Sequence, residues 1–171
     1  MSKQPESERY HTKRIDKPHY DVMAEAICKS VKFHPTVDQY RSFLDIGCSC
    51  GALLKSIENR SDDVVRTFGI DYSINAKEHW QPSGDFIQND FNQDPVLYTE
   101  VKEQFDVVIS MEFAEHIDKD EYLLWTVNEL SKKHTTLVFG AAHPNQPARG
   151  HVNLKWHREW MDIWTKWGWN Y

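Results

Sequence analysis

Several features are scarce in this sequence, and each absence excludes a class of protein. No apolar run approaches the roughly 20 residues that a bilayer-spanning helix needs. The N-terminal stretch MSKQPESERYHTKR lacks the apolar core of a signal peptide. The only cysteines are Cys28, Cys48 and Cys50, too few and too unevenly spaced for a disulfide framework. We therefore expect a cytoplasmic protein without a membrane partner.

An excess of basic charge is also missing, and so is any sign of subdivision. The formal net charge of −6 argues against a dedicated DNA-binding protein, which usually carries a basic surface. No internal repeat and no Pro-, Gly- or Ser-rich linker interrupts the 171 residues, and 40% of them are apolar, enough for one buried core. We therefore expect residues 1–171 to form a single domain.

What the sequence does contain is an alternation of short apolar strands and helices. Strands are expected at residues 42–47, 66–70, 85–88, 105–110 and 135–142. Helices are expected at residues 20–33, 52–60, 74–79, 96–103, 121–133 and 155–167. This alternation predicts an α/β fold, a doubly wound, Rossmann-like and mainly parallel sheet of about five strands with flanking helices. Residues 1–40 are expected to form a helical lid segment over the site.

Acids and glycines gather where the first three predicted strands end, which is where open α/β sheets bind ligands. The first strand runs into DIGCSCG (residues 45–51), a loop whose glycines permit a tight turn and close approach of a ligand. Asp71 ends the second strand and can accept hydrogen bonds from the hydroxyls of a ribose. Asp90 and Phe91 follow the third strand, where an acid and an aromatic ring suit the amine and face of a purine. Together these positions predict a ligand of the adenosine type.

The motifs LDIGCSCG, FGIDYS, IQND and FDVVISMEFAEHI resemble the successive motifs of class I S-adenosylmethionine-dependent methyltransferases, over about residues 42–142. The resemblance is to a short, phage- or bacterial-like form without the family's terminal β-hairpin, and it implies the strand order 3-2-1-4-5. It also implies S-adenosylmethionine as cofactor and S-adenosylhomocysteine as product. The residues that it places at the cofactor are Asp45, Gly47, Cys48, Gly51, Asp71, Tyr72, Asp90, Phe91 and Met111. One departure is Ser49, where the family usually has a glycine.

Two other functions stay open at this point. A nicotinamide-dependent oxidoreductase would need Gly-x-Gly-x-x-Gly to support a pyrophosphate, and residues 47–51 do not supply that pattern. A protein that binds S-adenosylmethionine without transferring its methyl group is the second alternative, because the family's terminal strands are missing here.

Acids and a histidine follow the fourth predicted strand. If the chain turns helical there, Glu112, Glu115 and His116 share one face at spacings i, i+3 and i+4. Such a face can bind a divalent cation, and its carboxylates favour magnesium or manganese. The Glu-x-x-Glu-His spacing with a later histidine resembles the metal motif of small-RNA 3′-terminal 2′-O-methyltransferases, which implies His151 as the fourth ligand. The alternative is a pair of residues that packs locally and binds no metal.

Two missing motifs narrow the methyl acceptor. Base N-methyltransferases carry Asp/Asn-Pro-Pro-aromatic after the fourth strand, where this chain has SMEF (residues 110–113). The Pro-Cys nucleophile of cytosine C5 enzymes is also missing. We therefore expect O-methylation of a small molecule, a sugar or an RNA end. His151 is expected to act as a general base near neutral pH, with Glu112 as a second catalytic residue.

Two features near the C-terminal end concern packing. The residues Trp156, Trp160, Trp164 and Trp167 form a stripe at helical spacing. This stripe is expected to pack on the sheet, and part of it could form an aromatic wall of the acceptor site. The fifth strand is expected at an edge of the sheet with unpaired backbone amides, so self-association into a homo-oligomer through that edge is a further prediction.

Overall fold

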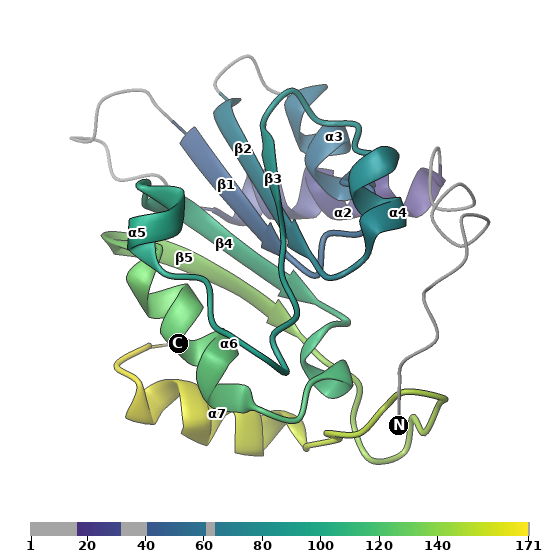
Figure 1. Ribbon diagram of the computed structural model, residues 1–171, viewed down its shortest axis with the longest axis vertical. Helices are drawn as coiled ribbons and strands as arrows, with labels where there is room; N and C mark the ends of the chain where they lie inside the picture. The colour runs from purple at the N-terminus through teal and green to yellow at the C-terminus, as the bar shows by residue number, and fades with distance from the viewer. Residues whose placement is uncertain (1–16, 32–40, 61–63, 171) are drawn as a thin grey trace.

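The structure is a computed structural model that describes residues 17–31, 41–60 and 64–170 (Figure 1). Most of the predicted lid segment, and the C-terminal end of the helix predicted to reach Phe33, lie outside these residues. Among the residues that the structure describes, no helix has the length and apolar character that a membrane crossing requires.

Five parallel strands form one sheet in the order β3-β2-β1-β4-β5, as predicted. The strands are β1 (Arg41–Ile46), β2 (Val64–Asp71), β3 (Asp85–Gln88), β4 (Phe105–Met111) and β5 (Ser131–Gly140). Asp45 lies level with Gly69 of β2 and Ile109 of β4. Because all the strands run the same way, the loops that follow β1, β2, β3 and β4 meet at one edge of the sheet.

Helices cover both faces of this sheet (Figure 1). They are α2 (Pro18–Ser30), α3 (Ala52–Glu58), α4 (Ile74–Glu78), α5 (Tyr98–Val101), α6 (Asp120–Glu129) and α7 (His157–Lys166). The short 3-10 helix η1 (Ala114–His116) follows β4. Side chains alternate along β1: Phe43 packs with α2 and α3, whereas Leu44 and Ile46 pack with α6 and α7. A sheet that is buried on both faces explains why these strands read as apolar runs.

The helix starts follow from their sequences. Pro18 stands at the first helical position of α2, where its missing N–H costs nothing. Gly51 precedes α3 with a left-handed φ of 77°, which favours glycine. The Ser73 hydroxyl caps α4 by accepting a hydrogen bond from the backbone N–H of Ala76 at 3.4 Å. The described part of α2 packs against α3, and its action as a lid stays a prediction.

Two predicted boundaries were wrong. The helix expected to reach Lys133 ends at Glu129, and β5 begins at Ser131, because the backbone N–H of Phe105 donates to Leu130 and draws this segment onto the sheet. The helix expected over residues 96–103 is only Tyr98–Val101, since Lys102 adopts a left-handed φ of 58° and ends it.

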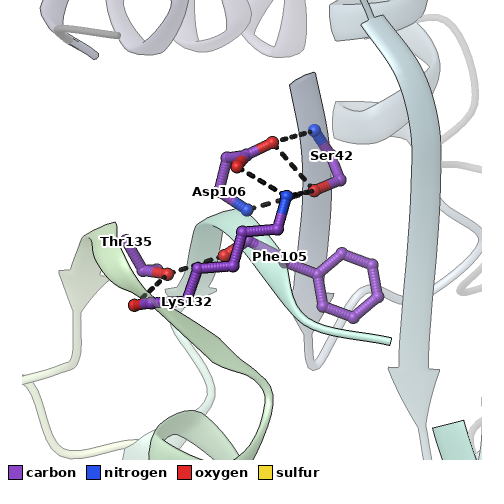
Figure 2. Close-up of polar contacts among 5 residues, drawn as sticks. All are labelled: Ser42, Phe105, Asp106, Lys132 and Thr135. Atoms are coloured by element: carbon purple, nitrogen blue, oxygen red, sulfur yellow. Dashed lines mark hydrogen bonds and ion pairs between the residues drawn. The ribbon is translucent and has the colours of Figure 1, made fainter. Parts of the chain in front are cut away.

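A polar network holds β1, β4 and β5 together at the end of the sheet opposite the candidate site (Figure 2). The Asp106 carboxylate accepts hydrogen bonds from the Ser42 backbone N–H at 2.8 Å and the Ser42 hydroxyl at 2.9 Å. The Lys132 ammonium lies 2.7 Å from the same carboxylate. The pairing of β4 with β5 is irregular here, and the Thr135 hydroxyl donates to the Phe105 carbonyl at 2.6 Å inside that irregularity.

The tryptophan stripe divides into a buried part and an exposed part. Trp160 and Trp164 are 2% and 3% exposed and pack on Phe139 of β5, with ring centroids 5.0 and 5.3 Å apart. The prediction of a core stripe is confirmed for these two residues. Trp156 is 49% exposed and stacks on His143 with an angle of 13° between the rings.

Candidate cofactor and acceptor site

Two carboxyl groups are buried where β1 and β2 end. Asp45 is 5% exposed and Asp71 is 7% exposed. Burial, together with the negative charge of Asp71, raises the pKa of Asp45 from 3.8 to about 7. A site that keeps two acids away from water favours a ligand with positive charge, because a cation stabilises the charge of Asp71 and favours the ionised form of Asp45.

The loop after β1 is fixed to the end of β2 by its own backbone. The N–H groups of Gly47 and Cys48 donate to the Ile70 carbonyl at 2.8 and 3.2 Å. The Asp71 carboxylate accepts from the N–H of Ser49 and from the N–H of Ser73, both at 2.9 Å. The Asp71 carboxylate therefore holds the loop after β1 and the start of α4 together at this edge of the sheet.

Aromatic rings cover the two glycines of this loop. Gly47 has a φ of 81°, and a Cβ atom there would lie 2.5 Å from the Phe113 ring. A Cβ atom on Gly51 would lie 2.5 Å from the Trp80 ring. Both positions therefore require glycine for backbone conformation and for close packing. Sequence reasoning assigned neither Trp80 nor Phe113 to this loop. Phe113 lies within the motif that follows β4, whereas the only signal for Trp80 was a large aromatic residue shortly after α4.

The remaining predicted cofactor residues lie at the same edge. The Asp90 carboxylate stabilises the turn in which it lies, because it accepts a hydrogen bond from the Asn92 backbone N–H at 3.0 Å. Phe91 is 2% exposed and packs edge-on against Phe113 at 5.4 Å, so it belongs to the core. Tyr72 and Met111 are half-buried. The cofactor contacts assigned to these four residues stay predictions.

The predicted helical face after β4 is wrong for Glu112. This residue has a φ of 53° and precedes η1, which contains only residues 114–116, so Glu112 cannot share a helical face with Glu115. Its side chain is exposed. The physical reason is that the chain must leave β4 through a turn before any helix begins. The Glu112 N–H still donates to the carbonyl of Gly140, the last residue of β5, at 2.9 Å.

Three of the four predicted metal ligands do come together. Among the described residues, Glu115, His116 and His151 each offer a ligand atom, and these atoms lie within 4.8 Å of one another; Glu112 is not part of this group. The two imidazole rings are 4.9 Å apart at 78°. Burial raises the pKa of Glu115, and the two imidazoles act against that rise.

Comparison with known proteins agrees with this arrangement. A family model described as "Methyltransferase domain" matches residues 20–169. No curated protein sequence matches the chain significantly. The carbon methyltransferase CurJ superposes with a TM-score of 0.70 at 13% identity, over 94% of this chain and 50% of that one.

Two further structural neighbours are named as N-methyltransferases. The sugar N-methyltransferase KedS8 from Streptoalloteichus sp. ATCC 53650 has a TM-score of 0.63 at 17% identity, covering 88% of this chain and 60% of that one. Coclaurine N-methyltransferase, solved with N-methylheliamine and S-adenosylhomocysteine, has a TM-score of 0.53 at 21% identity, covering 69% and 34%. At these identities the neighbours establish the fold and leave the acceptor open.

The five-stranded sheet and the acidic loops at its edge define a class I methyltransferase fold of the S-adenosylmethionine-dependent type. The chain belongs to the methyltransferase domain family, whose model covers most of its length.

Proposed function

We propose that this chain binds S-adenosylmethionine at the acids that end β1 and β2, and transfers its methyl group to an oxygen of a small molecule, a sugar or an RNA end. The observation that carries cofactor binding is the buried pair Asp45 and Asp71, in which the pKa of Asp45 is raised to about 7. When bound, S-adenosylmethionine supplies an electrophilic methyl group on a positively charged sulfur. The donor set fits, since its two acids suit the positive charges and the ribose hydroxyls of that molecule.

The chain's own residues then have separate tasks. Asp71 is held in place by two backbone N–H groups, so its carboxylate is oriented before any ligand arrives. Oriented groups of this kind lower the entropic cost of bringing reactants together. Asp45 lies one strand away and offers its charge when it loses its proton.

The assignment of an oxygen acceptor rests on the segment after β4 and on the basic groups beside it. Residues 110–113 do not carry the motif of base N-methyltransferases. An acceptor hydroxyl must lose a proton, and the His151 imidazole supplies a nitrogen that can accept it. Its Nδ1 lies 2.8 Å from the Gln146 carbonyl, which can only accept, so Nδ1 carries the proton and Nε2 is the basic atom. Glu112, exposed at the end of β4, stays a predicted second catalytic residue.

Thermal unfolding with and without ligand tests the cofactor, with EDTA present throughout. We expect S-adenosylmethionine and S-adenosylhomocysteine each to stabilise the protein, by about 2.7 kcal/mol at a 100-fold excess over Kd. The isosteric variant Asp71→Asn should lose this stabilisation, whereas Asp94→Asn, on the exposed loop after β3, should keep it. Cooperative unfolding with no shift for either ligand would contradict the proposal.

Turnover tests the acceptor. Formation of S-adenosylhomocysteine is measured by mass spectrometry with hydroxyl acceptors and with matched amine acceptors. Turnover with amines alone would contradict the oxygen assignment. Binding of S-adenosylmethionine without turnover on any acceptor would favour a binding protein instead.

A further inference from the structure

Glu115 has a buried carboxylate without a partner. The residue is 0% exposed, and neither Oε1 nor Oε2 has a hydrogen-bond partner among the described residues. Buried polar groups are nearly always hydrogen-bonded, because losing water without replacement costs free energy. A ligand that binds these two carboxylate oxygens would therefore compensate for the water that they have lost.

The ligand atoms around it are close enough to share one ion. Glu115, His116 and His151 bring one candidate atom each to within 4.8 Å of one another. Two atoms that both bind one metal at about 2.1 Å stand at most about 4.2 Å apart. The three candidate atoms therefore stand close to the separations that one shared ion requires.

Both histidines are oriented as metal-binding histidines usually are. His116 Nδ1 lies 3.1 Å from the Gly150 carbonyl, and His151 Nδ1 lies 2.8 Å from the Gln146 carbonyl. A carbonyl only accepts, so each Nδ1 carries the proton and each Nε2 has the lone pair that a metal binds. A histidine ligand that donates its other N–H to a carbonyl is held in the required tautomer and orientation.

The backbone fixes the distance between the two parts of the site. Glu115 and His116 come from η1, whereas His151 lies on the loop after β5. The N–H groups of Val152 and Asn153 both donate to the Glu115 carbonyl, at 2.8 and 3.1 Å. His151 is therefore held beside Glu115 by the residues that follow it.

We propose that Glu115, His116 and His151 bind one divalent transition-metal ion, whose open positions take the acceptor oxygen. Two imidazoles and one carboxylate favour zinc, manganese, iron or cobalt over magnesium, which prefers a shell of oxygens. This changes the expectation drawn from the sequence, which included Glu112 and favoured magnesium. Three protein ligands leave coordination positions open, as in catalytic metal sites.

The catalytic role of the ion rests on the proposed methyl transfer to oxygen. A hydroxyl bound to a divalent metal loses its proton more readily, and that proton passes to solvent. Methyl transfer then forms the oxygen–carbon bond and breaks the carbon–sulfur bond, whose electron pair stays on sulfur. His151 would then act as a ligand that orients the ion, and the ion would take over the task of the base.

Metal binding is measured on the full chain after treatment with EDTA and removal of the chelator. Zn²⁺ is titrated by calorimetry, and Co²⁺ by its visible absorption. We expect one ion per chain. His151→Ala, His116→Ala and Glu115→Gln should each weaken Zn²⁺ binding by more than about 100-fold, beyond the effect of losing an outer-shell partner. The matched control His143→Ala, from the same loop as His151, should bind as the unmodified chain does.

Two results would overturn the proposal. The first is that a protein that unfolds cooperatively binds neither Zn²⁺ nor Co²⁺ stoichiometrically. The second is that binding is undiminished in a folded Glu115→Gln variant, or in a folded variant that carries both His116→Ala and His151→Ala. Glu115→Gln keeps the shape of the side chain, so it serves if the alanine variants fail to fold. Because cofactor binding is measured in EDTA, loss of that binding alone would contradict the proposed function and leave the metal site standing.

Discussion

Asp45 and Asp71 lie at the ends of neighbouring strands, and each is more than nine-tenths buried. In the unfolded chain a carboxyl like that of Asp45 has a pKa of 3.8, against about 7 in the folded protein. The folded state therefore binds this proton more tightly than the unfolded state, so Asp45 favours folding most at low pH. The contribution of Asp45 is complete below pH 3.8 and is lost as the pH rises through 7, by roughly 4 kcal/mol in total.

The variant Asp45→Asn tests this cost. Its amide carries no charge, so we expect its free energy of unfolding at pH 8 to exceed that of the unmodified chain by about 2–4 kcal/mol, which raises its melting temperature. At pH 4 the two chains should unfold at nearly the same temperature. The variant should also bind S-adenosylmethionine more weakly. Scanning calorimetry across this pH range, with Asp94→Asn as control, measures the difference. A lower melting temperature at pH 8 would show that the Asp45 carboxylate stabilises the fold.

Ser49 adopts a left-handed φ of 51° where the family usually has glycine. This conformation costs a residue with a Cβ atom about 1 kcal/mol, whereas glycine adopts it without that steric cost. We expect Ser49→Gly to be more stable than Ser49→Ala by about 1 kcal/mol in urea unfolding. The alanine variant loses the hydroxyl but keeps the strain, so it separates the two effects. Equal stability of the variants would contradict the strain argument.

Single residues show what the sequence could reveal about the site. The positions of Asp45, Asp71 and the loop glycines were predictable because each lies at the end of an apolar strand or just after it, and the parallel sheet brings those ends together. Phe113 and Trp80 were not predictable, because their contacts with the loop depend on packing between distant segments. Glu112 was misplaced because residue spacing implies a shared face only within one continuous helix.

Among the elements, β5 depends most on polar contacts at its start. Asp106 accepts two hydrogen bonds from Ser42 and one charge-assisted bond from Lys132 (Figure 2). Asp106→Ala would leave the buried N–H and hydroxyl of Ser42 without this acceptor, so we expect a loss of about 1–3 kcal/mol in the free energy of unfolding. Lys132→Ala should cost less than about 1 kcal/mol, because the Lys132 side chain is 38% exposed and water screens its ion pair. If denaturant unfolding showed the same loss of unfolding free energy for both variants, this assignment of the larger contribution to Asp106 would be contradicted.

Element type was more predictable than element length. Every predicted strand appears in the sheet, because each is a short apolar run bounded by polar residues. Residues 131–133 were assigned to the preceding helix, since their sequence, SKK, favours neither state. Pairing with β4 decides their structure, and that long-range contact leaves no local signal.

At the scale of the whole molecule, the described residues leave β5 at the end of the strand order, with a neighbour only on the β4 side. Charged and polar residues at its start discourage edge pairing, whereas Leu137, Val138 and Phe139 further along favour it. We expect self-association through this apolar part of the edge. Sedimentation velocity over a wide concentration range should show a growing dimer fraction that persists at high salt, as apolar contacts do. A monomer at every concentration would contradict the prediction.

The placement of the tryptophans has an optical consequence. Trp160 and Trp164 lie between α7 and β5, whereas the Trp80 ring lies against the cofactor loop at Gly51. Among the seven tryptophans of the chain, these two groups therefore report on regions with different roles. Emission from the buried pair follows the loss of the edge strand during unfolding, and emission from Trp80 responds when a ligand occupies the loop. In Trp80→Phe the first signal remains and the second disappears, so one spectrum can separate the stability of the sheet edge from occupancy of the cofactor site.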